Sequence, residues 1–76
     1  MNAKRRSKIK LGIDQLEACA FYLRQIYDEE ELSYDNIPEN LKDSIRASEI
    51  EENLEVFEEA LDMIDEAISQ LEGVIL

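Results

Sequence analysis

The sequence predicts an all-α fold, namely an antiparallel two-helix hairpin of coiled-coil type that dimerises into a four-helix bundle. In both halves of the chain, apolar residues recur at alternating steps of three and four, which is the helical period. The single proline lies between the halves and marks a turn. The halves are matched in length, so they can lie side by side, and the 76 residues form one domain around one small core.

The helices are expected over about residues 3–33 and 44–73, with the turn at about 34–43 and the second helix ending at Gly73. The apolar stripe on each helix is wider than the seam of a two-stranded coiled coil, as is typical of a bundle. A lone hairpin leaves half of each stripe in water, so we expect a homodimer. The expected helix–helix core comprises Ile13, Leu16, Leu23, Tyr27, Ile50, Leu54, Phe57, Leu61, Ile64 and Ile68.

Local chemistry sets the expected helix ends around the turn. Pro38 has no backbone N–H and disfavours the helical conformation in the residue before it, so the first helix ends there. Ser44 or Asp43 can cap the second helix. Ser48, with Glu51 three residues later, offers an alternative capping box.

Folding the chain about Glu39 predicts the register of the two helices. Leu61 then lies opposite Leu16, and the other layers of the interface are apolar as well. The same register sets the basic residues at positions 4–10 beside the acidic residues at 65–72. We interpret the basic segment as charge matching within the hairpin, with a nucleic-acid-binding arm and a membrane anchor as the alternatives.

The net charge of -11 is concentrated in the second helix. Residues 47–76 contain ten acids and no base, which repels nucleic acid and anionic membranes and attracts basic protein surfaces. At ~1.5 Å per residue, these acids give roughly one charge per 3.6 Å, near the ~3.4 Å spacing along one DNA strand. The candidate partner-binding acidic face comprises Glu51, Glu55, Glu58, Glu59, Asp62, Asp65 and Glu66. The alternatives are a solvated face kept for solubility and a weak divalent-cation site.

A second candidate binding surface is apolar. It comprises Phe21, Tyr22, Val56 and Met63, which lie off the core stripe and which the expected register brings into one patch. Aromatic and methionine side chains are common where proteins bind other proteins. The alternative is that a second hairpin covers these residues in the dimer.

Catalytic and cofactor chemistry is not expected. The chain has no His, one Cys and no Gly-rich phosphate loop, and two helices provide no pocket that would desolvate a carboxylate for acid–base work. We therefore expect no enzyme activity, no cofactor and no dedicated metal site. No apolar run approaches ~18 residues, and no signal-peptide segment follows the basic start. The expected location is the cytoplasm of a bacterial host cell, with no membrane partner.

The turn also carries a family resemblance. It reads Tyr34-Asp35-Asn36-Ile37-Pro38-Glu39-Asn40-Leu41, followed by Ser44 and Arg46. This run resembles the turn of an uncharacterised family of short acidic helical proteins from bacterial phages, prophages and other mobile elements. The similarity covers about residues 11–72, and the sequence departs from the family pattern at Asp43, where a small residue often precedes the serine. The resemblance implies no catalytic residues and a compact protein that acts on a host process.

Two functions are consistent with these observations. The first is a non-catalytic acidic interaction module, an inhibitor that mimics nucleic acid toward a basic host protein and does not itself bind nucleic acid. The second is a structural or assembly module that self-associates as a four-helix bundle and has a solvated acidic face. Salt-sensitive binding of a basic partner favours the first function, whereas a tight dimer favours the second.

Overall fold

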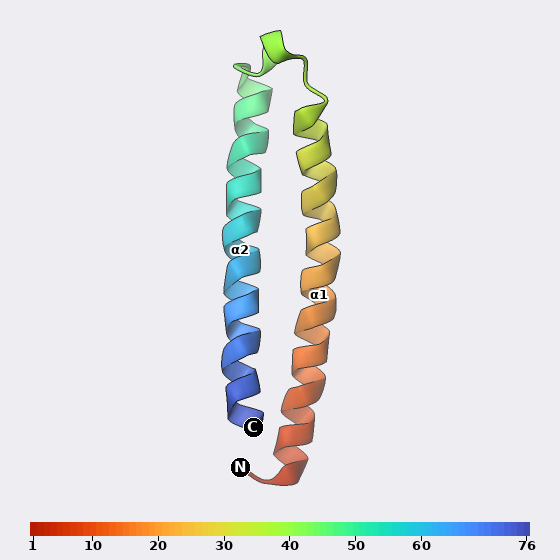
Figure 1. Ribbon diagram of the computed structural model, residues 1–76, viewed down its shortest axis with the longest axis vertical. Coiled ribbons are helices and arrows are strands. Elements are labelled where there is room, and N and C mark those ends of the chain that lie inside the picture. Colours follow the sequence, from red (N-terminus) through yellow and green to blue (C-terminus); the bar gives the residue numbers. More distant parts are fainter.

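The computed structural model describes residues 1–76 and consists of two long antiparallel helices joined by a short turn (Figure 1). Helix α1 spans Ala3–Asp35, helix α2 spans Ile45–Ile75, and a single 3₁₀ turn, η1, spans Glu39–Leu41. The molecule is a narrow rod, 59 Å long and 15 by 13 Å across, with both termini at one end (Figure 1). The predicted all-α hairpin is confirmed.

Side-chain and backbone hydrogen bonds define the ends of α1. The Oδ1 atom of Asn2 accepts a hydrogen bond from the backbone N–H of Arg5 at 2.8 Å, so Asn2 is the N-cap. At the other end, the N–H of Asn36 donates to the carbonyl of Leu32 at 3.0 Å. The helix therefore continues to Asp35, two residues beyond the expected end, and still stops before Pro38.

Ser44 is the N-cap of α2, which decides between the alternatives left by the sequence. Its Oγ atom accepts a hydrogen bond from the backbone N–H of Ala47 at 3.2 Å. The sequence predicted that the second helix ends at Gly73, but helix α2 continues to Ile75. A glycine ends a helix by taking a left-handed conformation, and no glycine here has a positive φ angle.

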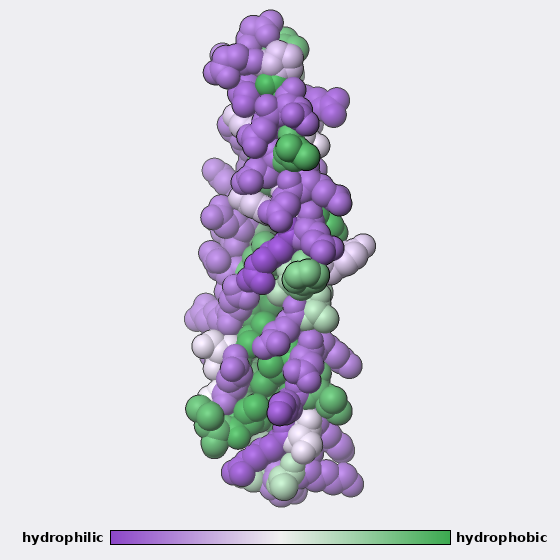
Figure 2. All heavy atoms as spheres, turned by 45° about the vertical axis from the view of Figure 1, so that its right-hand side comes forward, coloured by the Kyte–Doolittle hydropathy of each residue, from purple (hydrophilic) through white to green (hydrophobic).

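The core is a single line of small and medium-sized side chains. The six buried residues are Ile13, Ala20, Ala47, Ile50, Leu61 and Ile68. Four of the ten predicted core residues are among them, while the other six, Leu16, Leu23, Tyr27, Leu54, Phe57 and Ile64, are half-buried. Two cylinders touch along one line, so larger side chains stay open to water at the edges. Hydrophobic atoms are accordingly visible along part of the seam between the helices (Figure 2).

The helices meet in a different register from the predicted one. Leu61 lines a shallow hollow together with Arg24 and Tyr27, whereas the prediction placed it opposite Leu16. Arg24 also forms an ion pair with Asp65 of α2, with 2.6 Å between Nη2 and Oδ2. The shift is about one heptad, and a heptad slip exchanges one set of apolar layers for another. Periodicity alone could not distinguish the two registers.

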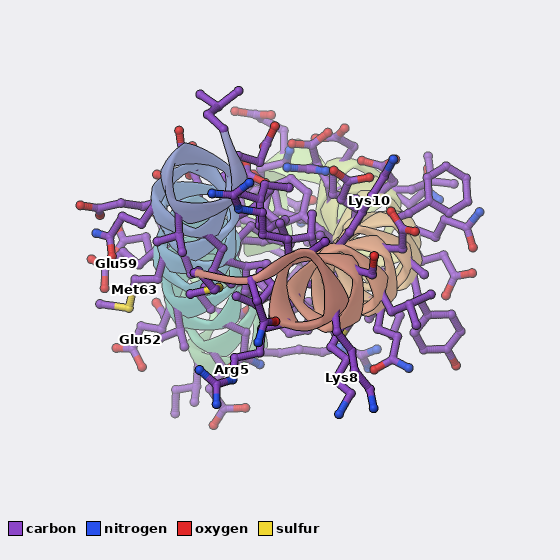
Figure 3. All side chains as sticks on the ribbon, turned by 90° about the horizontal axis from the view of Figure 1, so that it is seen from below. Arg5, Lys8, Lys10, Glu52, Glu59 and Met63 are labelled. Atoms are coloured by element: carbon purple, nitrogen blue, oxygen red, sulfur yellow. The ribbon has the colours of Figure 1, made fainter.

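The register shift also leaves the basic N-terminal segment without the predicted acidic partners. Residues 1–8 are all exposed, and the start of α1 extends beyond the end of α2 (Figure 1). No ion pair joins residues 4–10 to α2, since the one salt bridge of the chain is that of Arg24. Arg5 and Lys8 project from one side of α1, and Lys10 projects from the opposite side (Figure 3). The charge matching predicted for this segment is therefore not formed.

The N-cap assignment can be tested by a Ser44→Ala substitution. Loss of the bond to the Ala47 amide should lower the free energy of unfolding by about 1 kcal/mol. Ser48→Ala is the matched control, because Ser48 is exposed in the same turn of α2 and its side chain makes no hydrogen bond. Thermal unfolding followed by circular dichroism should show Ser44→Ala alone melting earlier. An equal loss for both variants would contradict the assignment.

Candidate protein-interaction surfaces

The hairpin has two long edges where the helices meet, and their chemistry differs. At one edge a hollow is lined by Arg24, Tyr27, Asp28, Glu58, Leu61 and Asp62, four of which are charged. A second hollow is lined by Ile26, Glu30, Asn53, Val56 and Phe57, of which only Glu30 is charged. Arg24 and Ile26 flank the core stripe of α1 on opposite sides, so the hollows lie on opposite edges. We call these the charged edge and the apolar edge.

Along the charged edge, carboxylates of α2 contact side chains of α1 at intervals of seven residues. The Tyr34 hydroxyl donates a hydrogen bond to Oε1 of Glu51 at 2.5 Å. Two heptads further along α2, Asp65 accepts a hydrogen bond from the guanidinium of Arg24. These two members of the predicted acidic face therefore hold α1 and α2 together.

Glu58 lies between these two contacts on the same edge. Partial burial and, after it, the negative charge of Glu58 raise the pKa of Tyr27 above its ordinary value of 10.0. Glu58 and Tyr27 also line the same hollow, together with Asp62. A third member of the predicted acidic face is thus directed at α1.

Tyr34 joins the end of α1, the turn and the start of α2. Its hydroxyl reaches Glu51, and the Nζ atom of Lys42 lies 4.6 Å from the centre of its ring. The hydrogen bond to Glu51 is the main cause that raises the pKa of Tyr34, followed by partial burial. No sequence pattern predicted this contact, because it depends on the register.

Five of the remaining seven acids of α2 form one unpaired stripe. Glu52, Glu55, Glu59, Asp62 and Glu66 follow one another at alternating steps of three and four, and all are exposed. None makes an ion pair or a side-chain hydrogen bond. Figure 3 shows Glu52 and Glu59 pointing away from α1. We call these five residues the outer acidic surface, which contains four of the seven predicted acids.

The four residues of the predicted apolar patch are divided between the two sides of the hairpin. Phe21, Tyr22, Val56 and Met63 are all exposed, at 64% to 70% of their surface. Val56 borders the apolar edge with Ile26, and neither Phe21 nor Tyr22 lines that hollow. Met63 points away from α1 (Figure 3). Tyr22 precedes Ile26 by four residues and so lies on the side of the apolar edge, whereas Phe21 precedes Arg24 by three residues and so lies on the side of the charged edge.

The chain offers no group of three or more Cys, Asp or Glu side chains arranged to hold a metal ion, and Cys19 is free and exposed. Neither helix combines the length and the hydrophobicity that crossing a membrane requires. No protein-family model, curated protein or solved structure matches the sequence or the fold. The geometry of the hairpin therefore carries the functional argument.

The Tyr34–Glu51 contact predicts a specific titration. Glu51→Gln should lower the pKa of Tyr34 toward 10.0, because it replaces the charged acceptor of the phenol by a neutral one. Glu52→Gln is the control, since the neighbouring Glu52 belongs to the outer acidic surface and should leave the pKa unchanged. An NMR titration of the Tyr34 ring measures both. The pKa of Tyr34 must differ between the two variants. Identical titration curves would contradict the contact.

The same contacts predict how stability depends on pH. The folded state raises the pKa of Tyr27 and Tyr34 above the unfolded value of 10.0, so it favours the neutral phenols. This contribution is complete below pH 10.0 and is lost as the pH rises through the folded-state pKa values. Urea unfolding at increasing pH should show stability falling above pH 10.0, and the fall should be smaller in Tyr34→Phe. An identical fall in that variant would contradict the assignment.

Proposed function

We propose that the chain is a non-catalytic interaction module that binds a basic protein surface through the outer acidic surface of α2. The observation that carries the proposal is the division of the acids of α2. Glu51, Glu58 and Asp65 face α1, whereas the five acids of the outer acidic surface have no partner within the chain. Like charges three or four residues apart weaken a helix by a few tenths of a kcal/mol per pair. A basic partner would relieve that repulsion.

The unbroken row of acids suits a partner that normally binds nucleic acid. From Glu52 to Glu66 the outer acidic surface extends about 21 Å along α2 at ~1.5 Å per residue. Its five charges are therefore about 5 Å apart, compared with ~3.4 Å along one strand of DNA, and no base lies between them. The proposed partner is therefore a host protein with a basic nucleic-acid cleft, which the hairpin would occupy as an inhibitor in the bacterial cytoplasm.

Two further observations support a binding role over a catalytic one. No polar or charged side chain is buried, so no carboxylate lies in the desolvated setting that acid–base catalysis uses. The turn sequence also resembles that of the acidic hairpin proteins of phages and mobile elements, which fits an inhibitor of a host process. A purely structural role would leave the outer acidic surface without any binding partner.

The proposal is tested by capturing proteins from a bacterial lysate on the immobilised chain at low salt and eluting them with duplex DNA. The affinity of the purified captured protein is then measured for a triple charge reversal, Glu55→Lys, Glu59→Lys and Asp62→Lys. We expect affinity to fall by at least about tenfold, because charge complementarity is reversed at the contact. Raising the salt concentration should weaken the wild-type complex.

The matched control reverses three exposed acids of α1, by Asp14→Lys, Glu17→Lys and Asp35→Lys, and so changes the net charge by the same amount. This variant should retain most of the affinity. Equal losses in both triple variants would show attraction by net charge alone and would contradict a defined acidic surface. Captured proteins that duplex DNA fails to displace would contradict nucleic-acid mimicry.

A further inference from the structure

Helix α2 carries a strip without a single charge beside the apolar edge. Its members follow one another at alternating steps of three and four, and they are exposed or half-buried. They are Val56, Ala60, Met63, Ala67, Gln70 and Val74. Residues 47–76 contain ten acids and no base, so an uncharged strip from Val56 to Val74 is notable. It borders the outer acidic surface, and Met63 lies beside Glu59 (Figure 3).

Helix α1 has a matching strip of Gln15, Cys19, Tyr22 and Ile26, again at alternating steps of three and four. Ile26 and Val56 line the same hollow, so the two strips lie on the same side of the hairpin. We call the two strips together the uncharged face. Its most exposed apolar side chains are Tyr22, Val56 and Met63, and Glu30 is the one charged residue in the hollow at the end of the face nearest the turn.

The area of the isolated chain shows that the hairpin has surface to spare for a partner. Its accessible surface is 6011 Å². A monomeric protein of 8.8 kDa is expected to expose about 4,800 Å², so the chain exposes about 1,200 Å² more than expected. A stable interface of standard size buries about 800 Å² on each partner. The excess is therefore enough for one such interface.

We propose that the uncharged face of one chain binds the uncharged face of a second copy and forms a four-helix bundle. Each copy has a net charge of -11, so two copies that met through their acidic sides would repel each other. The uncharged face is the side on which they can approach, and a twofold axis brings the same residues together from both copies. The hollow between Ile26, Val56 and Phe57 then receives side chains of the opposing helices as knobs enter holes.

This inference does not depend on the proposed function, because the two use different surfaces with opposite salt responses. Binding of a basic partner to the outer acidic surface weakens as salt rises. Association of two acidic copies through an uncharged face strengthens, because salt screens the repulsion between them. The bundle leaves the outer acidic surface of both copies open to solvent.

Sedimentation equilibrium of the full chain tests the bundle. The wild type should be a dimer at micromolar concentration and should associate more tightly as salt is raised. Met63→Lys should raise the dimer dissociation constant by at least about 30-fold, since it places a charged side chain in an apolar interface. Met63 is 70% exposed in a single hairpin, so circular dichroism should show unchanged helix content.

Phe21→Lys is the matched control. Phe21 is 65% exposed. It precedes Arg24 by three residues and Asp28 by seven, so it lies on the same side of α1 as these two residues of the charged edge. This variant should dimerise like the wild type. A wild type that stays monomeric at every salt concentration, a dimer that weakens with salt, or a Met63→Lys variant that dimerises as well as Phe21→Lys would each overturn the proposal.

Discussion

Two helices can touch along only one line, and the rest of this structure depends on that constraint. The line is occupied by six buried residues, among which Ala20 and Ala47 are 1% and 0% exposed and let the backbones approach closely. The other apolar residues of the core stripe, such as Leu16, Leu23 and Phe57, are half-buried at an edge. The contacts at the edges therefore determine both how the two helices are joined and which surfaces remain exposed. One edge is held together by carboxylates, tyrosines and an arginine, and the hollow of the other edge has Glu30 as its one charged residue.

The local structure could be predicted from the sequence because it depends on neighbouring residues. The heptad spacing predicted both helices, Pro38 predicted the end of α1, and Ser44 was one of the predicted caps. The register could not be predicted, because a slip of one heptad pairs apolar layers equally well. The registers are distinguished by contacts near the turn. There the hydroxyl of Tyr34 reaches Glu51, which lies nearly two helical turns into α2.

The errors at the candidate surfaces have the same origin. The acids of α2 could be identified from composition, but their division into a fastening row and an outer acidic surface depends on which of them meet α1. The apolar patch and the charge matching of the basic segment were both derived from the predicted register. The charge matching is not formed, and Phe21 lies on the opposite side of the hairpin from Val56. The uncharged face was not predicted, although its signal is present as a strip of α2 that avoids every acid.

The observed register is the central claim, because the division of the acids and the separation of the two edges both depend on it. It is tested most directly by nuclear Overhauser effects from the methyl groups of Leu61 within one chain. The hollow shared by Leu61 and Tyr27 predicts cross-peaks between these methyl groups and the Tyr27 ring protons. Cross-peaks from Leu61 to the methyl groups of Leu16, with none to Tyr27, would contradict the register.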